Sequence, residues 1–372
     1  MMDAALREVD RPRPFWWLRM RRSHPVSFFE FWPAWLFYAP VALQWLALGV
    51  RYGSPLLLTA ANPRIVTGGL CGESKSSILD QVEGEARQWL ARYTRLVTDA
   101  DPGRDATAAE AALAAAGLAY PLVGKPDIGC NGTGVRLLRE RQELVRFLAA
   151  YPRGAGVILQ EFIPYEGEAG LFYVRHPGAP AGKVTSLTLK SAPVVIGDGR
   201  STLEHLVRND PRAGLVPHLY LPRLAGRLNE VPPTGMPVRL VFVGNHCKGS
   251  NFQNGTNEIT PALTKTIDAI AQAIPDFHFG RIDVRFASLA ELRRGRGFRV
   301  IEINGSGSEA THIWDPNTSL ADAYRAQFFH YHAAFMIGRA NRARGHRPSG
   351  ILATLRHWRL QKRLMASYPM ND

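Results

Sequence analysis

The clearest alternation of apolar and polar residues lies in two segments, 280–286 and 298–305, and it predicts two β-strands. The loop between them is basic and contains two glycines, which suits a hairpin turn. Asp283 and Glu302 occupy matching faces of these predicted strands. If the strands are adjacent, the sequence brings the two acids to one point.

Asp283, Glu302 and the nearby Asn304 then offer three oxygen ligands without sulfur or histidine. Such a set suits Mg²⁺, a hard cation that usually keeps waters and substrate phosphates among its ligands. An edge hairpin whose acids are solvated is the alternative interpretation.

Residues 120–139 predict two further strands joined by a glycine-rich loop. Lys125 lies near the end of the first strand, and the loop contains Gly129, Gly132 and Gly134. These glycines permit positive φ angles and a close approach of the backbone, and inward-pointing amides can bind phosphate oxygens. Because the loop joins strand to strand, it differs from a P-loop or a Rossmann turn, which lead into a helix. A glycine-rich hairpin without a ligand is the alternative.

Residues 156–163 predict an apolar strand that ends in Gln160 and Glu161, and residues 164–174 predict a strand that runs back. Free backbone groups at a strand end can pair with an adenine edge, and an acid just beyond, Glu168, can bind ribose hydroxyls. Solvated surface acids are the alternative for both glutamates.

Nearer the N-terminus, residues 54–70 predict a short apolar strand followed by a turn. We expect a helix over residues 72–93 with Ser74 as its N-cap. An alanine-rich helix is expected over residues 107–117.

Residues 28–50 form the longest apolar run, and this run is rich in Trp and Tyr. It is long enough to span a bilayer, but Glu30, Gln44 and two prolines interrupt it. A cleaved signal peptide fits poorly, because the run starts late and is too aromatic. We expect monotopic or re-entrant association with a membrane, with burial against the protein or a partner, or a full span, as the alternatives.

Composition narrows the function classes. The 372 residues are 46% hydrophobic and 10% aromatic, which allows two or three domains and argues against global disorder. Three scattered cysteines favour a reducing compartment over a disulfide scaffold. The net charge of +13, concentrated at both ends, favours acidic partners. No RNA-binding aromatic pattern or helix-turn-helix signal is present, so nucleic-acid binding is not expected.

Taken in order, the motifs VGKPDIGCNGTGV, ILQEFIPYEGEAG, FGRIDVRF and VIEINGSGSEA resemble the ATP-grasp superfamily. The resemblance covers roughly residues 75–338, and it is nearest to D-alanine–D-alanine ligases and to the ATP-grasp domain of cyanophycin synthetases. It implies an α+β ATP-grasp fold, in which two α+β subdomains clamp the nucleotide. To this fold the aromatic run adds an expected membrane-associating helical segment at the N-terminus.

The resemblance also implies a role for each matching residue in nucleotide binding. Lys125 contacts the α and β phosphates, and Lys75 and Lys190 are further phosphate lysines, for which solvated surface lysines are the alternative. Glu168 binds the ribose. The loop that closes over the phosphates comprises Gly129, Gly132, Thr133 and Gly134, and the hinge that pairs with adenine comprises Glu161, Phe162 and Ile163.

For the metal and the substrates, the resemblance implies that Asp283, Glu302 and Asn304 hold two Mg²⁺ ions, with Mn²⁺ as a substitute. Arg281 is implied to stabilise the acyl phosphate and the tetrahedral intermediate. Substrate contacts are assigned to two polar segments, through His246, Lys248, Ser306 and Ser308. For His246, a hydrogen-bonded loop histidine is the alternative.

These observations predict four segments. They are a basic, aromatic segment (1–54), a truncated region before the ATP-grasp domain (55–118), the ATP-grasp domain itself (119–340) and a basic tail (341–372). The first segment leaves little room for the Rossmann-like domain that normally opens the family's chains.

The predicted function is an ADP-forming, ATP- and Mg²⁺-dependent carboxylate–amine or carboxylate–thiol ligase that acts through an acyl phosphate. A non-catalytic, membrane-associated nucleotide sensor with the same fold is the alternative. We expect small-molecule substrates, lipid-linked acceptors among them, and a location on the inner face of the cytoplasmic membrane. A homodimer is left open.

Overall fold

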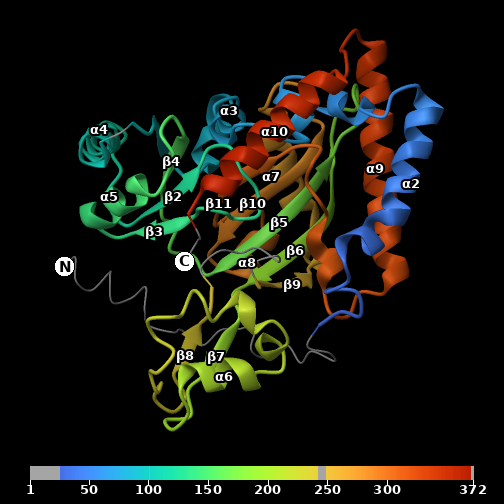
Figure 1. Cartoon of the computed structure of the whole chain (residues 1–372). Helices are drawn as coiled ribbons and strands as arrows, with labels where there is room; N and C mark the ends of the chain where they lie inside the picture. Colours follow the sequence, from blue (N-terminus) through green and yellow to red (C-terminus); the bar gives the residue numbers. More distant parts are fainter. Residues whose placement is uncertain (1–25, 100, 242–248, 370–372) are drawn as a thin grey trace.

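The computed structural model describes residues 26–99, 101–241 and 249–369. Its centre is a five-stranded sheet in which every neighbouring pair is antiparallel, with the order β11-β10-β5-β6-β9 (Figure 1). The strands are β5 (Gly167–Val174), β6 (Lys183–Ser191), β9 (Asn251–Asn254), β10 (Phe279–Phe286) and β11 (Phe298–Asn304).

The predicted hairpin is confirmed as β10 and β11. The two strands pair in antiparallel fashion, with Asp283 opposite Glu302 and Arg281 opposite Asn304. The connection is not a simple turn, because it contains the short helix α8 (Leu289–Arg293). The side chain of Ser288 caps the N-terminus of this helix.

A second antiparallel sheet has the order β1-β4-β2-β3 and carries the glycine-rich loop between β2 and β3. Two helices pack on it and share its apolar core (Figure 1). These elements are β1 (Tyr93–Val97), α4 (Pro102–Ala115), β2 (Leu122–Pro126), β3 (Arg136–Leu138), α5 (Arg141–Ala149) and β4 (Gly156–Glu161). Antiparallel sheets with packed helices confirm the expected α+β class.

A small third unit lies apart from these sheets, at the bottom of Figure 1, and has its own apolar cluster. It consists of β7 (Val194–Ile196), α6 (Leu203–Asn209), η5 (Ala213–Leu215), η6 (Pro217–Leu219) and β8 (Pro237–Arg239). Arg212 of this unit forms a buried ion pair with Glu30, which ties it to the N-terminal part of the chain.

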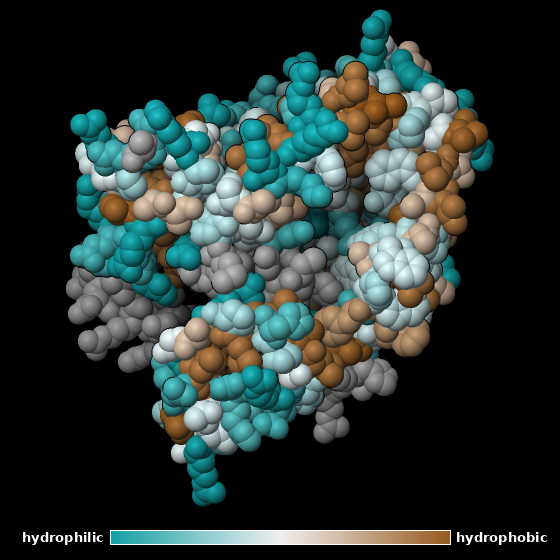
Figure 2. Space-filling view, viewed as in Figure 1, coloured by the Kyte–Doolittle hydropathy of each residue, from teal (hydrophilic) through white to brown (hydrophobic). Residues whose placement is uncertain are grey.

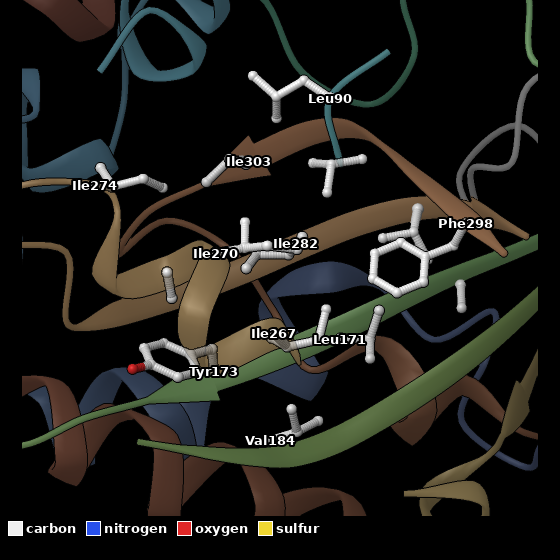
Figure 3. Close-up of a cluster of buried hydrophobic side chains, with 14 of the residues drawn as sticks. Leu90, Leu171, Tyr173, Val184, Ile267, Ile270, Ile274, Ile282, Phe298 and Ile303 are labelled. Atoms are coloured by element: carbon white, nitrogen blue, oxygen red, sulfur yellow. The ribbon is translucent and has the colours of Figure 1, made fainter. Parts of the chain in front are cut away.

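The largest core lies between the five-stranded sheet and α7 (Pro261–Gln272). Ile267 and Ile270 of this helix are fully buried and belong to the same cluster as Leu171 and Ile282 of the sheet (Figure 3). Each such side chain contributes about 1.5–3 kcal/mol to stability. The helix therefore covers one face of the sheet, whereas the opposite face carries Asp283 and Arg281 beside a second apolar cluster that includes Phe172.

The apolar run of residues 28–50 forms α2 (Ala34–Tyr52), which packs along α9 (Leu320–Ala343). Phe37 is 1% exposed and stacks on Tyr324 at 5.4 Å between ring centroids. Among the described residues, no helix has the length and hydrophobicity needed to cross a membrane. One side of α2 is buried against protein, which was an alternative interpretation of this run.

Two expectations about the N-terminal part of the chain were wrong. Residues 54–70 form no strand but the 3₁₀ segments η2 (Leu57–Ala61) and η3 (Val66–Gly69), where Gly68 and Gly69 have positive φ angles. The helix expected over residues 72–93 is only α3 (Lys75–Leu79) followed by η4 (Gly84–Trp89), because the chain turns at Gly84 with a φ of 59°. Ser74 does cap α3, since its Oγ accepts the amide of Ser77 at 3.0 Å.

The C-terminal helix α10 (Ile351–Ser367) crosses the molecule near the glycine-rich loop (Figure 1). Just after it, the hydroxyl of Tyr368 donates to the carbonyl of Ile128 in that loop at 2.9 Å. The predicted division at residues 54, 118 and 340 stays a prediction, although α2 and α10 both contact the central part of the chain. The remaining short elements are η8 (Thr256–Glu258) and η9 (Thr311–Trp314).

The contact between α9 and η2 can be tested at Gly338. A Cβ at this position would lie 2.1 Å from the carbonyl oxygen of Leu57. We expect Gly338→Ala to destabilise the protein by about 1–3 kcal/mol, despite the better helix propensity of alanine. Urea denaturation measures the change. Gly226→Ala, with no atom within 4 Å of its new Cβ, is the control and should shift stability by less than about 0.5 kcal/mol. Equal stability of both variants would contradict the close packing.

Candidate functional site

A cavity of about 630 Å³ lies between the four-stranded and five-stranded sheets. Most of the residues singled out in the sequence line it. These are Lys75, Lys125, Gly129, Gly132, Thr133, Glu161, Phe162, Ile163, Glu168, Lys190, Arg281, Asp283, Glu302, Asn304 and Ser308. Tertiary folding therefore gathers side chains from segments more than 200 residues apart.

Lys125, on β2, bridges the two sheets. Its Nζ donates to Oε1 of Gln160 at 2.9 Å and to the carbonyl oxygen of Ile301 at 2.8 Å. Both partners are neutral, and the side chain is almost fully removed from water. Burial lowers the pKa of Lys125 to about 8. A buried ammonium group without a directly bound carboxylate is well suited to an anionic ligand.

Two further lysines approach the same cavity, each paired with acids. Nζ of Lys75 lies 3.3 Å from Glu302, and Nζ of Lys190 lies 2.8 Å from Asp283 and 3.3 Å from Glu168. Burial by itself would lower the pKa of each lysine, but the neighbouring carboxylates outweigh it and raise both pKa values. The alternative that these are solvated surface lysines is wrong.

Asp283 is the most enclosed acid of the site, at 2% exposure. Its carboxylate accepts hydrogen bonds from Nε of Arg281 at 3.0 Å, from Lys190 and from Nδ2 of Asn304 at 3.1 Å. Burial favours the neutral acid, but the charges of Arg281 and Lys190 outweigh it and hold the pKa of Asp283 well below its ordinary value. The pKa of Glu302 is also lowered, against its burial, by Lys75 and Lys125.

The three predicted metal ligands do converge, since Asp283 and Glu302 are cross-strand partners and Asn304 contacts Asp283. Within the described residues, however, no group of three or more His, Cys, Asp or Glu side chains is placed to hold a metal ion. Two carboxylates and an amide fit Mg²⁺ as a partial set, because this ion usually takes one or two carboxylates and completes its shell with water and phosphate.

The glycine-rich loop contributes to the cavity through most, but not all, of its predicted residues. Asn131 and Gly132 have φ angles of 56° and 65°, and both line the cavity with Thr133. Gly134 does not line it. Its carbonyl oxygen accepts a hydrogen bond from the hydroxyl of Tyr151 at 2.6 Å. A Cβ on Gly134 would lie 2.4 Å from the hydroxyl oxygen of Tyr151. Packing against Tyr151 therefore accounts for Gly134.

The predicted adenine hinge lies at the end of β4. Phe162 and Ile163 follow the last residue pair of the β2–β4 ladder, so their main chain is beyond the sheet. The carboxylate of Glu161 points to Arg92, with 3.4 Å between Oε2 and Nε. Glu168 contacts Lys190 rather than lying free in solvent.

The predicted substrate residues do not all line the cavity. Ser308 lines the cavity and donates to the carbonyl of Gly305 at 2.6 Å. Ser306 does not line it, since its buried hydroxyl donates to the carbonyl of Leu58 at 2.9 Å. His246 and Lys248 lie outside the described residues.

Sequence reasoning missed several cavity residues, above all Glu73, Glu309 and a group of aromatic side chains. Glu73 stands two residues before Lys75, and burial raises its pKa. Glu309 follows Ser308 directly, so its place in the SGSEA run was a signal that could have been used. The aromatic group carried no local signal, because it comes from four separate segments: Tyr38, Phe252, Trp314 and Tyr331.

No family model matches the chain, and no curated protein matches it by sequence. Among solved structures, it is similar to a bifunctional glutathione synthetase from Pasteurella multocida, with 16% identity and a TM-score of 0.37 over 68% of this chain and 36% of that one. It is also similar to a D-Ala:D-Ser ligase from Enterococcus faecalis, with 15% identity and a TM-score of 0.40 over 72% and 63%.

A third similar structure is a D-alanine–D-alanine ligase from Bacillus anthracis, with 14% identity and a TM-score of 0.39 over 76% of this chain and 70% of that one. The chain thus spans about a third to 70% of the length of these three enzymes.

If an anionic ligand contacts Lys125, the lowered pKa of this lysine makes its binding depend on pH. The protonated lysine attracts phosphate, so a binding event above pH 8 must be accompanied by proton uptake. We expect the Kd for a non-hydrolysable ATP analogue with Mg²⁺ to rise by up to about tenfold per pH unit above 8. Lys75 and Lys190 stay protonated there, because their pKa values are raised.

Calorimetry between pH 7 and pH 9.5, in buffers of different ionisation enthalpy, measures both the affinity and the proton uptake. Lys125→Arg is the matched variant, since arginine remains charged over this range and should remove the pH dependence. A wild-type Kd that is constant over this range would show that Lys125 does not contact the anion.

Proposed function

We propose that this chain is an ADP-forming ligase that uses ATP and Mg²⁺ to join a carboxylate to an amine or a thiol. The observation that carries the proposal is the convergence of Lys75, Lys125 and Lys190 with Asp283 and Glu302 in one cavity. Three buried cations suit a triphosphate, whereas the two carboxylates suit its divalent counterion.

In this proposal the two sheets act as the two halves of an ATP-grasp clamp. The lysines bind the phosphates, and the amides of the glycine-rich loop close over them, aided by the left-handed backbone at Asn131 and Gly132. The main chain at Phe162 and Ile163, beyond the end of the ladder, is free of the sheet and available to an adenine edge. Glu168 is proposed to reach the ribose.

Asp283, Glu302 and Asn304 would hold Mg²⁺, with Mn²⁺ as a substitute and two ions in all. A bound divalent ion would neutralise charge on the phosphates and favour phosphoryl transfer. The protein's own contribution is mostly positioning, because the Arg281–Asp283 pair and the β10–β11 ladder fix where the charges lie.

The proposed chemistry proceeds in two steps. A substrate carboxylate attacks the γ-phosphorus of ATP and forms an acyl phosphate with release of ADP; an amine or thiol then attacks the acyl carbon and phosphate leaves. Arg281 has its guanidinium at the cavity wall and would stabilise the oxyanion of the second step. With an amine as the acceptor, this is C–N bond formation of the kind the resemblance to D-alanine–D-alanine ligases suggests.

Association with the inner face of the cytoplasmic membrane is a second part of the proposal, together with a lipid-linked acceptor. Its support is the outer side of α2, where Trp35, Leu43, Leu46 and Val50 are 60–86% exposed. Figure 2 shows apolar surface on the side where α2 and the start of α10 lie. Exposed apolar patches of this kind often mark interaction sites. The basic residues at both ends of the chain favour binding to anionic lipids.

The reaction can be tested by the formation of ADP with a panel of carboxylates, amines and thiols. We expect Glu302→Gln to lower ADP formation at least about a hundredfold, because it removes a charge that acts on the transferring phosphoryl group. Removal of Mg²⁺ with a chelator should have the same effect. Glu291→Gln, at a partly exposed acid on α8 that does not line the cavity, is the control and should retain full activity.

Binding of ATP without turnover of any substrate pair would instead favour the nucleotide-sensor alternative. Absence of both binding and turnover would overturn the proposed function.

The membrane part has its own test. We expect the Leu43→Ser, Leu46→Ser double variant to bind vesicles containing phosphatidylglycerol about tenfold or more weakly than the wild type, because two exposed side chains no longer enter the bilayer surface. Co-sedimentation measures the binding. The double variant Val97→Ser, Leu215→Ser changes apolar residues of similar exposure elsewhere and should bind normally. If the wild type does not sediment with the vesicles, the membrane part is wrong.

A further inference from the structure

One end of the cavity is built differently from the phosphate end. Four aromatic residues and one acid meet there: Tyr38 of α2, Phe252 of β9, Trp314 of η9, Tyr331 of α9 and Glu309. No phosphate lysine contacts Glu309. None of these five residues has a role in the proposed handling of ATP.

The carboxylate of Glu309 is held in place by several helices. Oε1 accepts the hydroxyl of Tyr38 at 2.8 Å and also Nε2 of Gln327 on α9. Oε2 accepts Nε1 of Trp314 at 2.7 Å. A carboxylate offers about four acceptor positions, and these hydrogen bonds among the described residues use three. Oε2 therefore keeps one acceptor position.

The aromatic side chains lie next to this carboxylate rather than elsewhere in the cavity. Tyr38 and Trp314 contact it directly, as above, and the charge of Glu309 adds to burial in raising the pKa of Tyr331 to about 12. Phe252 belongs to the same apolar cluster as Trp314. The fixed negative charge of Glu309 attracts an ammonium group, and the aromatic side chains beside it provide apolar surface for the group that carries the ammonium.

The position relative to the reaction centre is also suitable. Nη1 of Arg281 donates to the main-chain oxygen of Glu309 at 3.2 Å. A molecule bound against Glu309 is thus next to the guanidinium that the proposed function places at the oxyanion. The Tyr38, Trp314 and Tyr331 rings offer apolar area for the body of that molecule.

We propose that Glu309 and its aromatic neighbours form a substrate subsite for an ammonium group carried on an apolar or aromatic body. The inference rests on the proposed function, whose substrate class it narrows. Glu309 is the residue that selects for positive charge, and Tyr38 makes α2 part of the substrate site. A purely structural role for Glu309, as a link between α2, η9 and α9, predicts the same hydrogen bonds but no selectivity for ammonium.

The wild-type protein itself provides the first test. Phenethylamine, 2-phenylethanol and 3-phenylpropanoate present the same ring with a positive, a neutral or a negative end. We expect phenethylamine to bind at least about tenfold more tightly than the other two, measured by saturation-transfer NMR and calorimetry with and without a non-hydrolysable ATP analogue and Mg²⁺. Equal binding of the three probes, or binding of none, would overturn the subsite.

Two variants then assign the selectivity to Glu309. Glu309→Gln removes the charge and keeps the shape, so it should abolish the preference for phenethylamine over 2-phenylethanol while ATP-analogue binding is retained. Glu291→Gln, the control outside the cavity, should leave the preference unchanged. Retained selectivity in Glu309→Gln contradicts the assignment, and the selectivity is read from the ratio of the two probes, which a general loss of stability would not change.

The two proposals fail in different ways. If the wild type binds the ATP analogue normally but shows no preference for the ammonium probe, only the subsite proposal is wrong. If the wild type does not bind the ATP analogue, the proposed ligase function is wrong. The relative affinities of the three probes still test the subsite in that case.

Discussion

The constraint on which the site depends is the burial of opposite charges on neighbouring strands of the five-stranded sheet. Asp283, Arg281 and Lys190 are withdrawn from water together, and a buried ion without a partner would cost several kcal/mol. Pairing offsets that cost only when the geometry is accurate. Gly170, opposite Asp283 on β5, provides the space: a Cβ there would lie 2.9 Å from Oδ1 of Asp283 and 3.0 Å from Cδ of Arg281.

This pairing also specifies the register of the sheet. A slip of one residue would turn Asp283 and Arg281 toward α7 and expose Ile282 and Val284 to the cavity, because side chains alternate between the two faces. The apolar core and the charged cavity therefore demand the same register of β5, β10 and β11. Lys125 extends the arrangement to the second sheet through its hydrogen bond to the carbonyl of Ile301.

Both ends of the described chain complete the cavity. Tyr38 enters it from α2, and Gln361 enters it from α10, where Oε1 accepts the amide of Gly72. Tyr368 holds the carbonyl of Ile128 at the start of the glycine-rich loop. Segments that look peripheral in the sequence thus support the loop and the aromatic end of the site.

The sequence by itself determined the strands around the site and most of its charged residues, because alternation, glycine clusters and isolated acids in apolar strands are local signals. Only the tertiary structure decided that Ser306 and Gly134 serve packing, that Glu309 and Tyr38 reach the cavity, and that one side of α2 is buried on α9. The physical reason is that the hydrophobicity of a residue favours its burial but does not specify what buries it. Phe37 could be buried by lipid or by protein, and in the folded chain it is buried by long-range packing against Tyr324.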